Sequence, residues 1–205
     1  MKLTRRVVAG MCLIAMGCAW SAEPSGKTTL DNLQTSYNGE SNAQAKYEAF
    51  AAKADEEGYK SVATLFRAAA LSESIHAKKQ AAAIKKLGGD PKAAVEKPTV
   101  KSTKENLESA LAGETYEAET MYPAFLKQAQ AEKRKAAVIP FKGAQATEAG
   151  HVKLYKQALA ELDAWKASGK AFMVCQICGY TQFNDPALAK CPICAAPKEK
   201  FTVVK

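Results

Sequence analysis

Apolar residues recur at steps of three and four along two long stretches in the first half of the chain. This spacing predicts amphipathic helices, each of which buries one face. We expect the first helix over about residues 30–56, where Gly58 breaks the pattern, and the second over about 61–87. The second ends before Gly88 and Gly89, because glycine readily takes the left-handed conformation that follows a helix.

Residues 88–102 carry two prolines and no helical period. This segment is long for a link between antiparallel neighbours, and it suits a crossover that runs the length of a bundle. Ser102 and Glu105 then form a helix-start signal before a third apolar stripe. With a fourth stripe after the turn at 133–135, the pattern predicts an all-α four-helix bundle with a long crossover between its second and third helices.

The fourth helix is irregular in sequence, because Pro140, Gly143 and Gly150 fall in or near it. Within a helix, proline costs about 3 kcal/mol and glycine about 1 kcal/mol relative to alanine. We expect that the helix either begins near Pro140 or kinks there. Gly150 also predicts local flexibility beside His151.

The composition changes after a short linker at 166–170, where cysteines, prolines and aromatic residues replace the helical stripes. We therefore divide the chain into an N-terminal segment at 1–22, a helical domain at 28–166 and a small domain at 171–205. The small domain is too short to fold on a hydrophobic core alone. We expect a bound metal to stabilise it.

Both histidines of the chain lie in a repeated Glu-x-x-His pattern on predicted helices, and each pair follows a lone glutamate at nearly the same separation, 73 − 40 = 33 and 148 − 114 = 34. A spacing of three residues puts two side chains on one helix face. Solvated helix faces would explain one such pair, but two copies favour a site for two iron or manganese ions. The predicted ligands are Glu40, Glu73, His76, Glu114, Glu117, Glu148 and His151.

Four cysteines of the small domain form two C-x-x-C pairs, Cys175 with Cys178 and Cys191 with Cys194. Disulfides are the alternative in an exported protein, but two such tight pairs fit a tetrahedral metal site better. The spacing by itself suits zinc and a single iron equally. Gly179 can adopt a positive φ and so help to aim backbone N–H groups at sulfur.

These motifs, in this order, resemble the rubrerythrin family over nearly the whole chain after the N-terminal segment. The resemblance implies a ferritin-like bundle with a non-haem diiron centre, followed by a rubredoxin-like domain. It rests on Gly39-Glu40-Ser41 with Tyr47, Glu73-Ser-Ile-His76, Gly113-Glu114-Thr-Tyr-Glu117 with Met121-Tyr122-Pro123, Glu148-Ala-Gly-His151, Cys175-Gln-Ile-Cys178-Gly179-Tyr180 and Cys191-Pro-Ile-Cys194.

The resemblance also implies a role for each bundle ligand. Glu73 and Glu148 bridge the two irons, and the two lone glutamates, Glu40 and Glu114, are terminal ligands on opposite sides. One histidine, His151, holds its iron in every state.

The remaining implied residues are those expected to take part in catalysis. One iron exchanges Glu117, its ligand when oxidised, for His76 when reduced. Two tyrosines, Tyr47 and Tyr122, hydrogen-bond the glutamate ligands; core aromatic packing is the alternative for them.

The implied activity is the reduction of hydrogen peroxide to water, with electrons entering through one iron in the four-cysteine site. Zinc is the alternative metal there, and Ala195 stands where free-standing rubredoxins usually carry glycine. An external electron-donor protein is expected, because the sequence has no nucleotide-binding fingerprint. The family pairs subunits head to tail, which implies a homodimer or a higher homo-oligomer. A ferroxidase or iron-sequestering protein and a zinc-loaded structural protein are the rival functions.

The first residues predict export. Lys2, Arg5 and Arg6 precede an apolar stretch at 7–17 that is too short for a mature membrane span. The paired arginines resemble a twin-arginine signal and predict a periplasmic protein. Two alternatives are a lipoprotein, anchored to the membrane through Cys18, and an uncleaved membrane anchor.

The formal net charge of +8 does not indicate nucleic-acid binding. Loss of residues 1–22 removes three basic residues and no acidic one, so the rest of the chain carries 8 − 3 = +5. The remaining lysines are dispersed along the solvent faces of the predicted helices, whereas a nucleic-acid site gathers them on one face. We expect no nucleic-acid partner.

Overall fold

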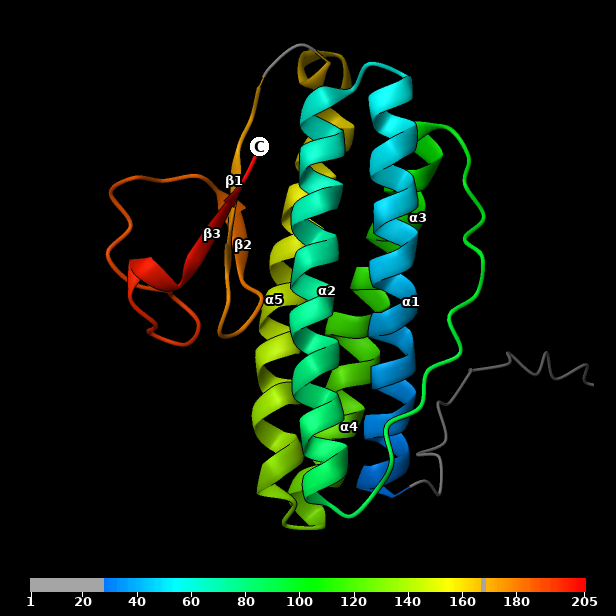
Figure 1. Cartoon of the computed structure of the whole chain (residues 1–205), viewed down its shortest axis with the longest axis vertical. Coiled ribbons are helices and arrows are strands. Elements are labelled where there is room, and N and C mark those ends of the chain that lie inside the picture. Colours follow the sequence, from blue (N-terminus) through cyan, green and yellow to red (C-terminus); the bar gives the residue numbers. More distant parts are fainter. Residues whose placement is uncertain (1–27, 167–168) are drawn as a thin grey trace, which may run out of the picture.

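The computed structural model describes residues 28–166 and 169–205, and its helices form four rods (Figure 1). Three consecutive segments, α3, η1 and α4, make one rod, because the backbone stays helical across both junctions. The predicted four-helix bundle is therefore confirmed. The segments are α1 (Thr29–Glu56), α2 (Lys60–Lys86), α3 (Thr103–Tyr116), the π-helix η1 (Glu117–Met121), α4 (Tyr122–Ala131) and α5 (Lys135–Ala160).

Local capping chemistry explains where the helices begin. The predicted signal at Ser102 and Glu105 is a complete capping box, in which each side chain accepts a hydrogen bond from the other residue's backbone N–H. Thr28 and Asp31 form a second box at the start of α1. The turn between α1 and α2 contains Gly58 at φ +80°. The predicted bounds of the first two helices agree with the structure to within one residue.

The irregular sequence of the fourth rod does not delay its start. α5 begins at Lys135, so the expectation of a start near Pro140 is wrong. Proline removes one backbone donor, a loss that the helix tolerates here because Pro140 and Phe141 are buried in the core. Gly150 faces the C-terminal domain: an added Cβ would lie 4.0 Å from the Tyr180 ring, which is an ordinary contact, so alanine would also fit there.

The π-helix η1 interrupts the third rod immediately before a proline. Pro123 is at the start of α4 and lacks the N–H that would bond to the carbonyl of Glu119. A wider π turn is one way for a helix to absorb such a break, and π turns are frequent at functional sites. Glu117, the first residue of η1, thereby leaves the regular helical spacing that the sequence suggests.

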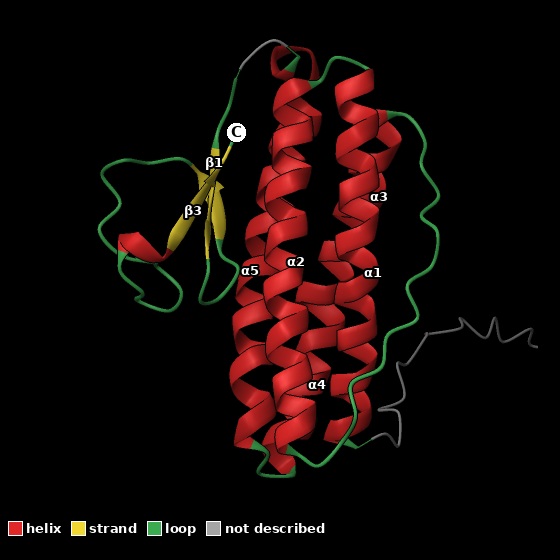
Figure 2. Cartoon of the chain, viewed as in Figure 1, coloured by secondary structure: helices red, strands yellow, loops and turns green. Residues whose placement is uncertain are grey.

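The crossover runs in an extended conformation along α1, as Figure 2 shows in green. The amide side chain of Asn38 accepts from Ala94 N at 2.8 Å, and that of Asn42 accepts from Glu96 N at 2.9 Å. From Asn38 to Asn42 the helix rises about 6 Å, and from Ala94 to Glu96 the extended chain rises about 6.6 Å. The spacing of the two asparagines therefore matches that of the two backbone N–H groups that they bind. The predicted crossover is therefore held by side chains of the first helix.

A small antiparallel sheet forms the C-terminal domain. Its strand order is β2-β1-β3, and β1 pairs with both neighbours through Phe172, which lies opposite Phe183 and Val204. The elements are the 3-10 turn η2 (Leu162–Trp165), β1 (Phe172–Cys175), β2 (Thr181–Phe183), the 3-10 turn η3 (Lys198–Lys200) and β3 (Phe201–Val204).

This domain shares a hydrophobic core with the bundle. Trp165, Phe172 and Val174 are fully buried and belong to the same apolar cluster as Leu65 and Phe66 of α2. The sheet therefore lies against α2 and α5 (Figure 1). Burial of these side chains stabilises a domain that is too small for a separate core.

In the part of the chain that the structure describes, no helix is both long enough and apolar enough to cross a membrane. The predicted export segment at 1–22 lies outside the described residues.

Candidate metal centres

Six of the seven predicted bundle ligands converge in the middle of the helices. They come from all of α1, α2, α3 and α5, and all six are buried. They form two overlapping groups, in each of which the ligand atoms lie within 4.8 Å of one another. Two glutamates belong to both groups, as bridging ligands would. The groups are Glu40, Glu73, His76 and Glu148, and Glu73, Glu114, Glu148 and His151.

Buried atoms without partners show that this centre fits a pair of cations. Both oxygens of Glu148 and one oxygen each of Glu40, Glu73 and Glu114 have no hydrogen-bond donor, and Nδ1 of His151 has no hydrogen-bond partner. Leaving charged oxygens unpaired in the interior is costly. Carboxylates and imidazoles in this set are the donors that bundles use for two iron ions.

The pKa values express the same crowding of acids. Burial and the charge of Glu73 raise the pKa of Glu148 to about 8. Burial also opposes ionisation of Glu73, but in the metal-free centre the positive charges of His151 and His76 outweigh it and lower the pKa of Glu73 to about 2. Ionisation of Glu148 beside Glu73 therefore requires added positive charge, which two metal ions would supply.

Each histidine turns one ring nitrogen to the carboxylates and the other to the C-terminal domain. His76 Nδ1 lies 3.0 Å from oxygens of Glu73 and Glu148. Its Nε2 lies 3.0 Å from the carbonyl oxygen of Cys178, which can only accept, so Nε2 carries the hydrogen. When the ring loses its second proton to bind a metal, the lone pair of Nδ1 is the one that becomes free.

The two predicted tyrosines contact the glutamates from outside the centre. Tyr47 donates to Glu114 Oε1 at 2.7 Å, and Tyr122 donates to Glu40. The amide of Gln80 also donates to Glu40, at 3.1 Å, and to the Tyr122 oxygen, at 2.8 Å. The sequence interpretation missed Gln80, although its position four residues after His76 continues the inward face of α2.

Glu117 is the one predicted bundle ligand that belongs to neither group. It is only partly exposed, and its pKa is raised well above the ordinary value by burial and by the charges of Glu40 and Glu114. The carboxyl group of Glu117 is therefore close enough to the centre for the charges of the other glutamates to raise its pKa. In this conformation His76, and not Glu117, lies against the shared carboxylates.

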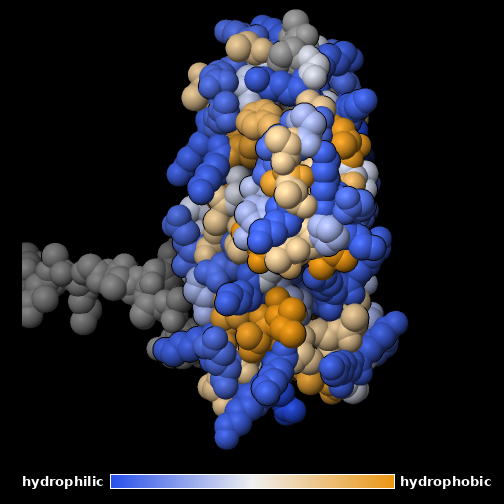
Figure 3. Space-filling model, turned by 90° about the vertical axis from the view of Figure 1, so that its left-hand side faces the viewer, coloured by the Kyte–Doolittle hydropathy of each residue, from blue (hydrophilic) through white to orange (hydrophobic). Residues whose placement is uncertain are grey.

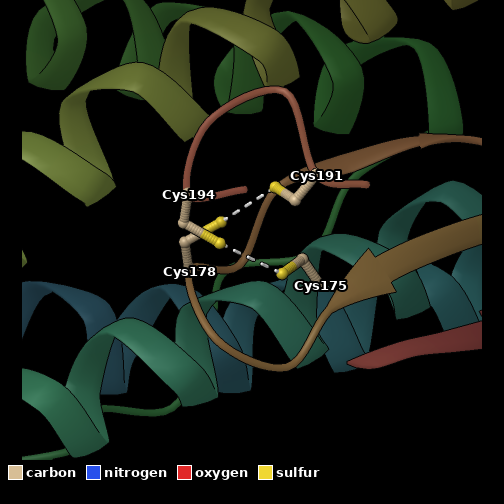
Figure 4. A group of neighbouring side chains, drawn as sticks. All are labelled: Cys175, Cys178, Cys191 and Cys194. Atoms are coloured by element: carbon tan, nitrogen blue, oxygen red, sulfur yellow. Dashed lines mark hydrogen bonds between the residues drawn. The ribbon is translucent and has the colours of Figure 1, made fainter. Parts of the chain in front are cut away.

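The four predicted cysteines converge into a second centre, the four-cysteine site (Figure 4). The sulfur of Cys175 lies 3.7 Å from that of Cys194, and the sulfur of Cys178 lies 3.6 Å from that of Cys191. A tetrahedral metal with bonds of about 2.3 Å to sulfur spaces its ligands about 3.8 Å apart. These distances fit a metal and exclude disulfides among the four.

The two cysteine loops have matching geometry. Gly179 has φ +87° and Ala195 has φ +58°, and each donates its backbone N–H to the carbonyl of the cysteine four residues earlier. A hydrogen bond from Cys178, together with backbone N–H groups of Ile177 and Cys178, lowers the pKa of Cys175 to about 5 despite the burial of this side chain. The predicted positive φ of Gly179 is confirmed, and Ala195 takes the same conformation without being glycine.

The two centres lie side by side within one chain. Cys178 belongs to the four-cysteine site and also contacts His76 through its carbonyl. A Cβ on Gly179 would lie 2.5 Å from His76 Nε2 and 2.6 Å from Ser72 Oγ, so only glycine permits this approach. The head-to-tail pairing that the resemblance implies would bring the four-cysteine site of one subunit to the diiron centre of another. In this structure, a chain's own four-cysteine site packs on its own bundle.

Comparison with known families gives two matches that follow the two parts of the chain. The family described as "Rubrerythrin" matches residues 31–159. The family described as "Rubrerythrin, rubredoxin-like domain" matches residues 174–202.

Individual relatives match over most of their length. Nigerythrin of Nitratidesulfovibrio vulgaris is 40% identical over 176 residues, which is 85% of this chain and 86% of the relative. Rubrerythrin-2 of Clostridium acetobutylicum is 34% identical over 177 residues, covering 84% of this chain and 95% of that protein. The solved structure of fully reduced, all-ferrous nigerythrin is 36% identical, superposes with a TM-score of 0.82, and covers 99% of this chain and 100% of that one.

Proposed function

Because the chain belongs to the rubrerythrin family, whose members are generally oxidoreductases, we propose that it is a peroxidase that reduces hydrogen peroxide to water. Each peroxide takes two electrons and two protons to give two waters. The observation that carries the proposal is the contact between the two centres, where His76 Nε2 donates to the Cys178 carbonyl at 3.0 Å. An iron store would need no thiolate group at this position.

Two irons in the bundle would supply the electrons that break the O–O bond, and an iron in the four-cysteine site would replace those electrons one at a time. The chain's part is to hold and orient these groups. Glu73 and Glu148 face both metal positions. Tyr47 and Tyr122 fix the carboxylates of Glu114 and Glu40 by donating a hydrogen bond to each.

We propose that Glu117 and His76 exchange places with the redox state. Removal of electrons raises the positive charge of the centre and so favours an anionic ligand, whereas the reduced centre accepts the neutral imidazole. The described conformation, with His76 beside the carboxylates and Glu117 outside the groups, is the one expected of the reduced protein.

The electron donor is proposed to be a separate protein that docks beside the cysteine loops. Ile177 is 41% exposed and Ile193 is 39% exposed, each next to a metal-binding cysteine. The face that carries this domain is mainly hydrophilic, with apolar patches between the charged side chains (Figure 3). A small apolar contact within a polar surface suits a transient electron-transfer partner.

Assembly and location complete the proposal. We propose a homodimer, which light scattering can test. Because the two centres are in contact within one chain, electron transfer needs no second subunit.

We also propose export through the twin-arginine signal. Replacing Arg5 and Arg6 by lysine should then stop export, and mass spectrometry of the mature N-terminus separates cleavage near Ala22 from lipidation at Cys18.

Anaerobic stopped-flow experiments on the fully reduced protein test the activity. We expect about three irons per chain, two in the bundle and one in the four-cysteine site. Peroxide should be consumed as the thiolate-to-iron absorption of the ferric state returns, and Cys178→Ser should abolish that absorption and slow turnover. Rapid reaction with dioxygen but not with peroxide would favour a ferroxidase, and zinc in the four-cysteine site would favour a structural role.

A further inference from the structure

The second histidine of the bundle has a partner that the sequence interpretation did not identify. His151 Nε2 lies 3.2 Å from the hydroxyl oxygen of Thr181, the first residue of β2. His151 is fully buried and Thr181 is 2% exposed, so water cannot reach the pair to replace this bond. The contact joins α5 of the bundle to the sheet of the C-terminal domain.

The direction of this hydrogen bond follows from the other contact of the hydroxyl. Thr181 Oγ1 lies 2.9 Å from the carbonyl oxygen of Gly179, which can only accept. A hydroxyl has a single hydrogen, and here that hydrogen points to Gly179. The Thr181 oxygen must therefore accept from His151, so the neutral ring that binds a metal keeps its one hydrogen on Nε2.

The other nitrogen of the ring is then free to bind a metal. His151 Nδ1 lies 3.0 Å from Glu148 Oε2, 3.3 Å from Glu73 Oε1 and 3.4 Å from Glu114 Oε1, and it has no hydrogen-bond partner. With the hydrogen on Nδ1 instead, the lone pair would point away from all three carboxylates. The hydroxyl of Thr181 thus selects the ring form that can hold an ion.

We propose that Thr181 is a positioning residue for the diiron centre: from the C-terminal domain, it fixes the tautomer and the rotation of His151. A metal-bound histidine that loses such a partner typically loses about 10- to 100-fold in metal affinity. Docking of the C-terminal domain would then complete the iron site as well as deliver electrons to it. The inference concerns iron binding and does not depend on peroxide being the oxidant.

The two histidines differ in how easily this support can be removed. His76 bonds to a main-chain carbonyl, which any residue at position 178 provides. His151 depends on a side-chain hydroxyl, which only serine or threonine supplies with this reach. Position 181 can therefore be tested with substitutions that leave the backbone and the cysteine ligands unchanged.

The experiment compares Thr181→Val, which keeps the side-chain shape, with Thr181→Ser and Thr181→Ala, which differ from each other by the hydroxyl alone. Thr64→Val is the matched control, because the buried Thr64 hydroxyl bonds within its own helix. Zinc loaded into both centres is the probe. The chain has only two histidines, so ring-nitrogen NMR resolves both, and contacts to the Tyr155 ring assign His151.

We expect the Nε2–H of His151 to exchange with solvent at least about 10-fold faster in the valine and alanine variants. Their bundle affinity for zinc should fall about 10- to 100-fold, while His76 keeps its signal. The serine variant and Thr64→Val should behave as the wild type. If the valine variant does not fold, the serine and alanine variants give the same comparison. Serine and alanine variants with equal affinity and equal exchange would overturn the proposal.

Discussion

At the scale of single residues, the centre depends on which buried groups face the metal positions and which stay one turn away. His76 and Glu117 are the clearest pair. The His76 ring lies against Glu148, one of the two glutamates that face both metal positions. Glu117 lies outside both ligand groups, and burial and its acidic neighbours raise its pKa. The proposed exchange requires both groups, so each can be tested separately from iron binding.

Glu117→Gln should still bind two irons, because the six converging ligands remain. We expect peroxide turnover to fall at least about 10-fold, since the oxidised centre loses its anionic ligand. Iron analysis and stopped-flow kinetics measure the two effects. Glu119→Gln is the matched control, because Glu119 is on the same π-helix but exposed. Wild-type kinetics with an unchanged diferric spectrum in the Glu117 variant would show that this acid is not a ligand.

The raised pKa of Glu148 predicts how the metal-free bundle responds to pH. The pKa of Glu148 is about 8 when folded, against an ordinary value of 4.5, so the folded protein keeps a proton that unfolding releases. Its stabilising contribution is complete below pH 4.5 and is lost as the pH rises through 8. With zinc kept in the four-cysteine site, the denaturation temperature should fall from about pH 5.5 to about pH 8.5.

Two comparisons isolate this effect. Glu148→Gln has no proton to lose and should reduce the slope of the pH dependence. The remaining slope comes from His76 and His151, whose pKa values the neighbouring carboxylates raise. Metal in the bundle should reverse the pH dependence, because ligands bind metal more tightly once deprotonated. A metal-free wild type and Glu148→Gln with equal slopes would contradict the assignment.

At the scale of secondary-structure elements, side-chain amides hold the crossover in place, and side-chain carboxylates bind the first backbone N–H groups of the helices. Each of the helices α1 and α3 has a second contact at its start, in addition to its capping box. At the first turn of α1, the backbone N–H of Thr29 donates to Glu132. At the first turn of α3, that of Thr103 donates to Glu57. These bonds satisfy donors that a helix leaves free at its N-terminus. Side chains distant in sequence therefore support the same ends that local signals already define.

Asn42→Ala should loosen the crossover. Asn42 accepts from Glu96 N and donates to Ala94 O, so its loss removes two bonds, each of which contributes about 0.5–1.5 kcal/mol. Urea unfolding should show a loss of about 1–3 kcal/mol, and the Glu96 amide should exchange faster. Gln44→Ala on the same helix is the control, because its amide bonds only to Glu48. Alanine favours the helix more than asparagine or glutamine does, so propensity cannot cause a loss. Equal losses in both variants would show that the bonds to the crossover are not responsible.

At the scale of the whole molecule, the important fact is that two centres far apart in sequence share one interface. The sheet buries Phe172 and Val174 in the core of the bundle, and this brings the Cys178 carbonyl to His76 and the Thr181 hydroxyl to His151. The C-terminal domain therefore contacts both histidines of the diiron centre.

Gly179→Ala should separate the centres without emptying the cysteine site. The new methyl group would lie 2.5 Å from His76 and 2.6 Å from Ser72, and the alanine would also take a φ of +87°, which costs about 1–2 kcal/mol. We expect an intact thiolate-to-iron absorption band but slower electron transfer to the bundle, measured by stopped flow. Ala195→Gly, at the matching position of the other loop, should leave that rate unchanged. An unaltered rate in Gly179→Ala would mean that this contact does not carry the electrons.

The sequence by itself determined the helices, the crossover and which residues are candidate ligands. Period, capping residues and the paired Glu-x-x-His and C-x-x-C spacings are local properties, and side chains three apart must share a helix face wherever the helix lies. Only Glu117 left the predicted group, because a π turn depends on Pro123 further along the rod. The start of α5 was missed for a similar reason, since buried packing offsets the cost of Pro140.

What only the tertiary structure decided is how the two domains meet. No spacing rule relates Gln80 to Tyr122 or Thr181 to His151, because these contacts join segments whose separation in sequence carries no geometric information. The position of the sheet against α2 and α5 depends on burying Trp165 and Phe172 together. Burial of these side chains is favourable where the apolar surfaces of the sheet and the bundle match in shape, and the surface of the bundle exists only once its helices have packed together.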